Sequence, residues 1–121
     1  MAVIRISIMR PVPGRRQEVE RLLEELEAWV SQQKGYLFGI HLSSFDLTGE
    51  LGRVAVYASR EDANRIAVMD HTVALRSQVH DAIMPGHMES LFEVTAASKS
   101  MGIPGVPVAG AVKARAGNKK G

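Results

Sequence analysis

Residues 36–58 decide the fold, and they read YLFGIHLSSFDLTGELGRVAVYA. Large apolar residues occupy every second position of 36–43, and 52–58 is rich in valine. Alternation with β-branched and aromatic residues predicts two strands. Asp46 and Gly49 lie between them and are typical of turns. Because strands joined by a short loop usually pair with each other, this stretch predicts an antiparallel hairpin.

A strand and a helix are expected before the hairpin. Residues 3–10 alternate isoleucines with polar residues, which predicts a strand that ends at the Pro11–Gly14 turn. Residues 15–33 carry apolar side chains at helical spacing and glutamates on the other faces. This pattern predicts an amphipathic helix, and Gly35 is a natural stop for it.

The order helix then strand follows the hairpin. Ser59 is a plausible N-cap, and helical character extends from it to about Met84. The apolar stripe shifts near Asp70–His71, so the helix is expected to break there. Residues 88–95 predict a fourth strand.

This order predicts an α+β, ferredoxin-like βαββαβ domain over residues 1–98. It has a four-stranded antiparallel sheet with both helical segments on one face. We assign the Ile4, Ile6 and Ile8 side to the helices. The opposite face then has mixed polarity and carries the following residues: Arg5, Ser7, Met9, Leu37, His41, Arg53, Ala55 and Tyr57. A homodimer whose two sheets face each other would cover it, forming a dimeric α+β barrel.

Composition restricts the chemistry. The 121 residues include no cysteine, which excludes disulfides, thiolate metal sites and cysteine nucleophiles. The four histidines form no pair at ligand spacing on one helix face, so we expect no metal site. No phosphate-binding glycine loop occurs, and we expect no cofactor. Without a long apolar run or an apolar leader, the sequence predicts no membrane span and a cytoplasmic location.

Residues 99–121 differ from the domain before them. Residues 1–98 hold ten Lys/Arg against thirteen Asp/Glu, a net charge of −3, whereas the tail holds five basic residues and no acid. Its Gly/Pro-rich composition predicts a flexible extension or a docking segment. Docking on a protein partner would use these residues: Ile103, Val106, Val108, Lys113 and Arg115. Without aromatic residues the tail is a poor candidate for nucleic-acid binding.

Three stretches resemble the antibiotic biosynthesis monooxygenase-like (ABM) family of dimeric α+β barrels. They are Lys34–Tyr36, Val54–Ala63 and Met69–Thr72, the last resembling the family's helix break. The resemblance covers about residues 2–96. Members of this family include cofactor-free oxygenases of quinols and polyketide-derived phenols, haem-degrading enzymes and many proteins with no established activity. The haem branch would need other residues at Ser7, Ile66 and Arg76, so we set it aside.

The resemblance and the chemistry together predict a monooxygenase acting on a small aromatic, quinol or polyketide-like substrate. Such a site needs a base near neutral pH and groups that stabilise a phenolate. His71 is the expected base, with Tyr57 and His41 positioning the substrate and Arg53 and Ser7 contacting it. Four of them also have a structural interpretation: His71 as a capping or helix-break residue, His41 as a hydrogen-bonded structural histidine, Tyr57 as a core aromatic and Arg53 as part of a cross-strand ion pair. The alternative function is a non-catalytic ABM-like module or accessory subunit that docks through its tail.

Overall fold

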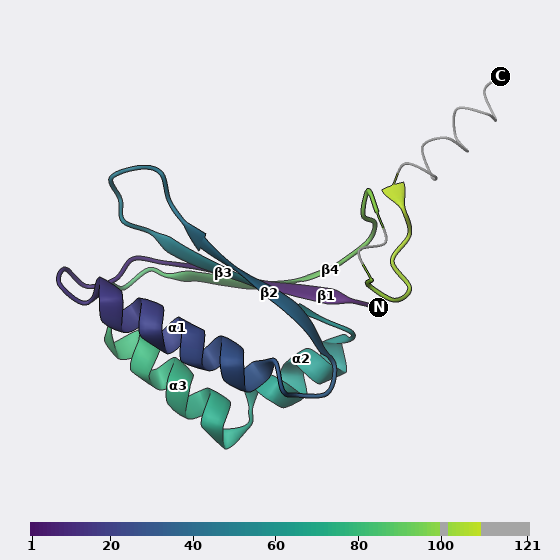
Figure 1. Ribbon diagram of the computed structural model, residues 1–121, viewed down its shortest axis with the longest axis horizontal. Coiled ribbons are helices and arrows are strands. Elements are labelled where there is room, and N and C mark those ends of the chain that lie inside the picture. Colours follow the sequence, from purple (N-terminus) through teal and green to yellow (C-terminus); the bar gives the residue numbers. More distant parts are fainter. Residues whose placement is uncertain (100–101, 110–121) are drawn as a thin grey trace.

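The computed structural model describes residues 1–99 and 102–109 (Figure 1). The elements run in this order: β1 (Val3–Met9), α1 (Arg16–Val30), β2 (Tyr36–Ser43), β3 (Leu51–Tyr57), α2 (Arg60–Ala67), α3 (Asp70–Asp81) and β4 (Met88–Glu93). The strands form one antiparallel sheet in the order β2-β3-β1-β4, and the helices lie on one face of it. The predicted βαββαβ fold is therefore confirmed.

Helix boundaries follow from local chemistry. Helix α1 buries the stripe of Val19, Leu22, Leu23, Leu26 and Val30. Helix α2 begins after Ser59, whose side chain accepts a hydrogen bond from the backbone N–H of Asp62. The expected break separates α2 from α3 at residues 68–69, one or two positions before Asp70–His71.

The assignment of the two sheet faces was wrong. The side of β1 with odd residue numbers faces the helices, where Val3 and Met9 belong to the main core with Leu51, Ala55 and Tyr57. Ile4, Ile6 and Ile8 lie on the other face. The most apolar side of β1 is thus the side away from α1, α2 and α3, and the polar Arg5 and Ser7 point between the sheet and these helices.

A bulge in β2 adds to this reversal. The register shifts between Tyr36 and Phe38, so Leu37 has no partner on β3. Tyr36 consequently sits opposite Tyr57 on the helix side, with the ring centroids 5.4 Å apart. Phe38 turns to the open face and packs there together with Leu37. A bulge places an extra residue in one strand and thereby changes which residues share a face.

The open face of the sheet is a wide apolar surface. Ile40, Met88 and Phe92 are 48%, 44% and 52% exposed on it. The paired residues Ile4 and Val56 continue it toward the N-terminal end of β1. Helices α1, α2 and α3 all lie on the other side of the sheet in Figure 1, so no helix of residues 1–99 and 102–109 covers this face. An apolar surface of this kind usually marks an interaction site.

Residues 102–109 fold back onto one end of that face (Figure 1). Ile103 is 8% exposed and packs with Ala2 and Val56, and Val106 packs beside them. Val108 forms a parallel bridge with Ala97. Ile103 and Val106, the residues that the docking interpretation would place on another protein, therefore pack on the chain's own sheet. The predicted contacts of Lys113 and Arg115 lie outside the described residues.

Among the helices within residues 1–99 and 102–109, none combines the length and the apolar character that crossing a bilayer requires.

The packing of Ile103 should contribute to the free energy of unfolding of the protein. Ile103→Ala removes a buried side chain and should lower the free energy of unfolding by about 1–2 kcal/mol. Chemical denaturation followed by circular dichroism measures this difference. Val73→Ala, at a 52% exposed position on α3, should leave the midpoint unchanged. Equal midpoints for wild type and Ile103→Ala would show that the segment contributes nothing to the fold.

Candidate functional site

A narrow pocket lies between the sheet and the helices, with a cavity volume of about 50 Å³. Its floor follows one cross-strand row of the sheet. Glu89 on β4 pairs with Ser7 on β1, and Ser7 pairs with Arg53 on β3. His41 on β2 continues the same row to the sheet edge. Neighbouring strands thus bring four polar side chains from distant parts of the sequence onto one line.

The walls of the pocket come from α1 and α3. Helix α1 contributes the apolar Leu23, Leu26 and Val30. Helix α3 contributes Thr72, Arg76, Val79 and His80, which recur at helical spacing and therefore share one face. An apolar pocket with a few convergent polar groups is typical of small-molecule sites.

Arg53 is the most unusual polar residue of the pocket. It is 5% exposed, and its Nε and Nη2 atoms have no hydrogen-bond partner among residues 1–99 and 102–109. The nearest carboxylate is Glu27, with Oε1 3.8 Å from Nη2. Buried donors without acceptors are uncommon and costly. The guanidinium group is therefore able to accept an additional anionic or hydrogen-bonding partner.

Glu27 is itself held by Tyr36, whose hydroxyl donates to the carboxylate. Burial, together with this hydrogen bond, raises the pKa of Tyr36 far above its usual range. The tyrosine thus stays protonated and remains a donor. Gly39 lies directly beneath the pair. A Cβ at this position would collide with the Glu27 carboxylate and the Tyr36 hydroxyl, so the contact requires glycine. The Glu27 carboxylate is consequently shared between Tyr36 and Arg53. It therefore balances only part of the positive charge of Arg53.

Glu89 occupies the opposite end of the floor between two arginines. Arg76 Nη2 donates to both carboxylate oxygens at 2.6 Å, and Arg5 Nη1 donates to Oε1 at 3.0 Å. Burial raises the pKa of Glu89, but the two guanidinium groups outweigh that effect and the net result is a lowered pKa. The carboxylate is therefore ionised and fully engaged near neutral pH.

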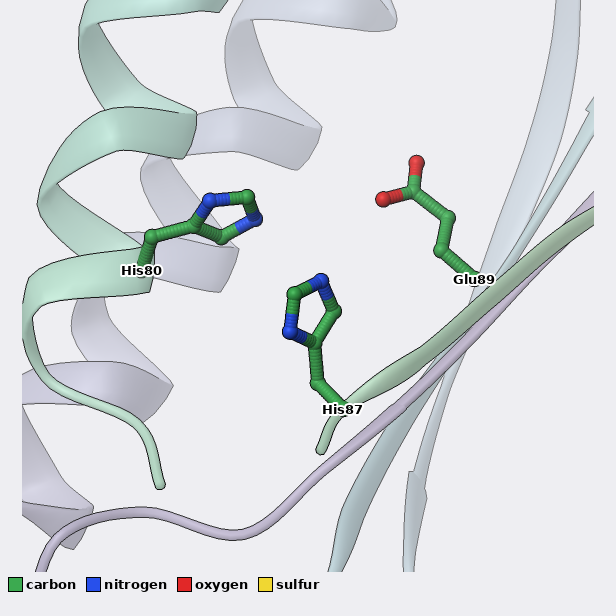
Figure 2. Close-up of side chains that lie close together, drawn as sticks. All are labelled: His80, His87 and Glu89. Atoms are coloured by element: carbon green, nitrogen blue, oxygen red, sulfur yellow. The ribbon is translucent and has the colours of Figure 1, made fainter. Parts of the chain in front are cut away.

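Two histidines border the mouth beside Glu89 (Figure 2). His80 comes from α3 and His87 precedes β4, with their ring centroids 4.7 Å apart. One potential ligand atom from each of His80, His87 and Glu89 lies within 4.8 Å of the others, which is a metal-like spacing. The expectation of no metal site considered only pairs on one helix face, and this cluster joins a helix to a strand. Its charges disfavour a cation, since Arg5 and Arg76 already neutralise Glu89.

The predicted site residues separate into two groups. Ser7, Arg53 and Tyr57 line the pocket, on the helix side of the sheet rather than on the open face. His41 is exposed at the sheet edge, in a shallow hollow beside α1. His71 is also exposed and does not line the pocket.

The ring of His71 packs against Trp29, with the centroids 4.5 Å apart. Trp29 Nε1 in turn donates to the Thr72 hydroxyl at 2.9 Å, and Thr72 lines the pocket. His71 is thus connected to the pocket through two other side chains. Its predicted role as the base stays a prediction, and it would require His71 to act from outside the described pocket.

Sequence reasoning missed Arg76, His80, His87 and Glu89 as members of one site. A signal for part of it was available, because residues 72, 76, 79, 80 and 83 share one face of a predicted helix. His87 and Glu89 carried no comparable signal. Their place beside His80 depends on how the loop after α3 returns the chain to the sheet.

No protein-family model and no curated protein matches the sequence. Solved structures do match. SnoaB, a cofactor-independent oxygenase from Streptomyces nogalater, is 16% identical with a TM-score of 0.71, covering 79% of this chain and 95% of SnoaB. Rv0793 from Mycobacterium tuberculosis is 20% identical with a TM-score of 0.74, covering 82% of this chain and 100% of Rv0793.

An antibiotic biosynthesis monooxygenase is 15% identical with a TM-score of 0.68, and the match covers 77% of this chain and 97% of that one. At such identities the likeness establishes the fold alone. The predicted resemblance to ABM proteins is confirmed at this level.

The ion pairs of Glu89 make a prediction about pH. A carboxyl group whose pKa is lowered by folding stabilises the protein above its unfolded pKa and ceases to do so as the pH falls through its folded pKa. Glu89→Gln should therefore lower the free energy of unfolding at pH 7 by about 1–2 kcal/mol. The difference from wild type should shrink as the pH falls below about 4.

Urea unfolding between pH 3 and pH 7 measures this difference. Glu93→Gln is the matched control, because Glu93 is exposed on the same strand. A stability difference between wild type and Glu89→Gln that stays constant over this pH range would contradict the ion-pair interpretation.

Proposed function

We propose that the protein is a cofactor-free monooxygenase that oxidises a small aromatic, quinol or polyketide-like substrate in the pocket between sheet and helices. One observation carries the proposal: an apolar pocket contains a buried guanidinium group, Arg53, with free donor atoms. Fold similarity to SnoaB, itself a cofactor-independent oxygenase, supports it. The apolar walls would hold an aromatic ring, and Arg53 would stabilise the negative charge that forms on its oxygen.

The reaction begins with removal of a proton from the substrate. The resulting electron-rich anion reduces O2 and forms a carbon–oxygen bond, giving a peroxide on the substrate. Cleavage of the O–O bond leaves one oxygen atom in a carbonyl group of the product and releases the other as water. A CH2 group flanked by phenol rings thus becomes C=O, and the substrate itself supplies all the electrons. The protein contributes a base, an apolar pocket and anion stabilisation.

His80 is our candidate for the base. It lines the pocket from α3, whereas His71 lies outside it against Trp29. An imidazole is suited to proton transfer near neutral pH. Tyr57 and Ser7, which also line the pocket, position the substrate in this scheme.

We also propose that the chain forms a homodimer through the open sheet face. Ile40, Met88 and Phe92 would be covered by the second sheet, which explains why this face is the more apolar one. The non-catalytic alternative has less support than the enzyme, because docking through Ile103 and Val106 would first require them to leave their own sheet.

The two histidines allow a direct test of the enzyme. Oxygen uptake with a panel of anthrones and hydroquinones should detect turnover by the wild type. His80→Gln should reduce the rate by about 100-fold or more, the usual contribution of a general base. His71→Gln is the matched control and should keep both the rate and the melting temperature.

Loss of turnover in His71→Gln with an unchanged melting temperature would identify His71 as the base instead. Absence of oxygen uptake with every substrate would contradict the monooxygenase proposal and leave the accessory module as the better interpretation.

The dimer has its own test. Light scattering of the full chain should give a molar mass near twice 13.2 kDa. Phe92→Glu places a charge in the proposed sheet-to-sheet contact and should shift the protein to monomer. Val73→Glu changes an equally exposed residue (52%) on α3 and should leave the dimer intact. A wild-type monomer would contradict the proposal.

A further inference from the structure

The pocket contains more positive than negative charge. Arg5, Arg53 and Arg76 line it, and Glu89 is the one carboxylate among its lining residues. Counting Glu27, which lies 3.8 Å from Arg53, still leaves a surplus of one positive charge with both histidines neutral. A pocket lined by surplus positive charge attracts anions.

The orphaned donors of Arg53 point to the same kind of ligand. Its side chain is 6% exposed, and Nε and Nη2 lack acceptors among the described residues. A guanidinium group presents parallel N–H donors that match the two oxygens of a carboxylate. Neither Arg5 nor Arg76 competes for such an anion with Arg53, because both already donate to Glu89.

The cluster of His80, His87 and Glu89 could instead be interpreted as a cation site (Figure 2). Against this, a divalent ion bound to Glu89 would approach the two guanidinium groups that already hold the carboxylate. Bringing it there would cost either both ion pairs or strong charge repulsion. The same two arginines make the region favourable for an anion.

We propose that the substrate class of this pocket is an aromatic carboxylate, with the carboxylate group bound by Arg53 and the ring held by the apolar walls. The inference rests on the proposed function in that it uses the same pocket. It goes beyond that function by requiring an acidic group on the substrate in addition to the oxidised ring.

Isothermal titration calorimetry with a matched pair of ligands tests the inference. The probes are 2-hydroxybenzoate and 2-hydroxybenzamide, which differ in the charge of one group. The full-length wild type should bind the carboxylate at least about tenfold more tightly than the amide, as expected for a charge-assisted hydrogen bond in a pocket. Equal affinities for the two ligands, or no binding of the carboxylate, would overturn the inference.

Arg53→Met should abolish the difference between the two ligands, and Arg21→Met should preserve it. Arg21 is an exposed residue of α1 that pairs with Glu25, so it is a control for the loss of one positive charge. Arg53→Met is expected to fold, since it keeps an apolar chain about as long as the aliphatic part of arginine and removes the orphaned polar atoms. The comparison of ligands on the wild type remains decisive if it does not fold.

The result separates this inference from the proposed function. Oxygen uptake with neutral quinols, combined with equal affinities for the two benzoate derivatives, would keep the oxygenase and reject the carboxylate. Selective binding of the carboxylate without any oxygen uptake would keep the ligand class and reject the oxygenase. Tight Zn²⁺ binding that is lost in His87→Asn would also overturn the inference, because it would make the cluster a cation site.

Discussion

The uncovered apolar face of the sheet is the constraint on which the other features depend. Ile40 and Phe92 are about half exposed there, and Ile4 and Val56 extend the same surface. A four-stranded sheet with helices on one side has two faces to satisfy, and water is a poor solvent for the second. Because the three isoleucines of β1 point to that open face, the alternating Arg5 and Ser7 must point inward toward the helices.

Placing polar residues under the helices creates the pocket and also makes it costly. Arg53 is buried with two orphaned donor atoms, while Glu89 is balanced by Arg5 and Arg76. An isolated buried charge can cost several kcal/mol, which is a large share of the 5–15 kcal/mol that typically stabilises a domain. Leu22 and the other helix residues supply the compensating apolar burial. The polar groups of the pocket therefore destabilise the fold, as the residues of functional sites often do.

The sequence allowed the order of elements to be predicted but not the orientation of the sheet. Periodicity identified every strand and helix, and Ser59 marked the start of α2. Alternation with a period of two shows that two faces differ without showing which one meets the helices. Here the more apolar face is the open one, and the bulge at Leu37 changes the parity within β2. Ser7 and Arg53 were therefore placed on the wrong side of the sheet, although both line one pocket.

Residues 102–109 cover part of the open face of the sheet. Ile103 covers the end of the face near Ala2 and Val56, so a second sheet can reach only the remaining part, where Ile40 and Phe92 are exposed. The pocket opens on the opposite side of the sheet, toward α3. The proposed dimer contact and the proposed ligand site therefore lie on different faces of the sheet, so substitutions at Ile4 and its neighbours would alter the first without touching the groups around Arg53.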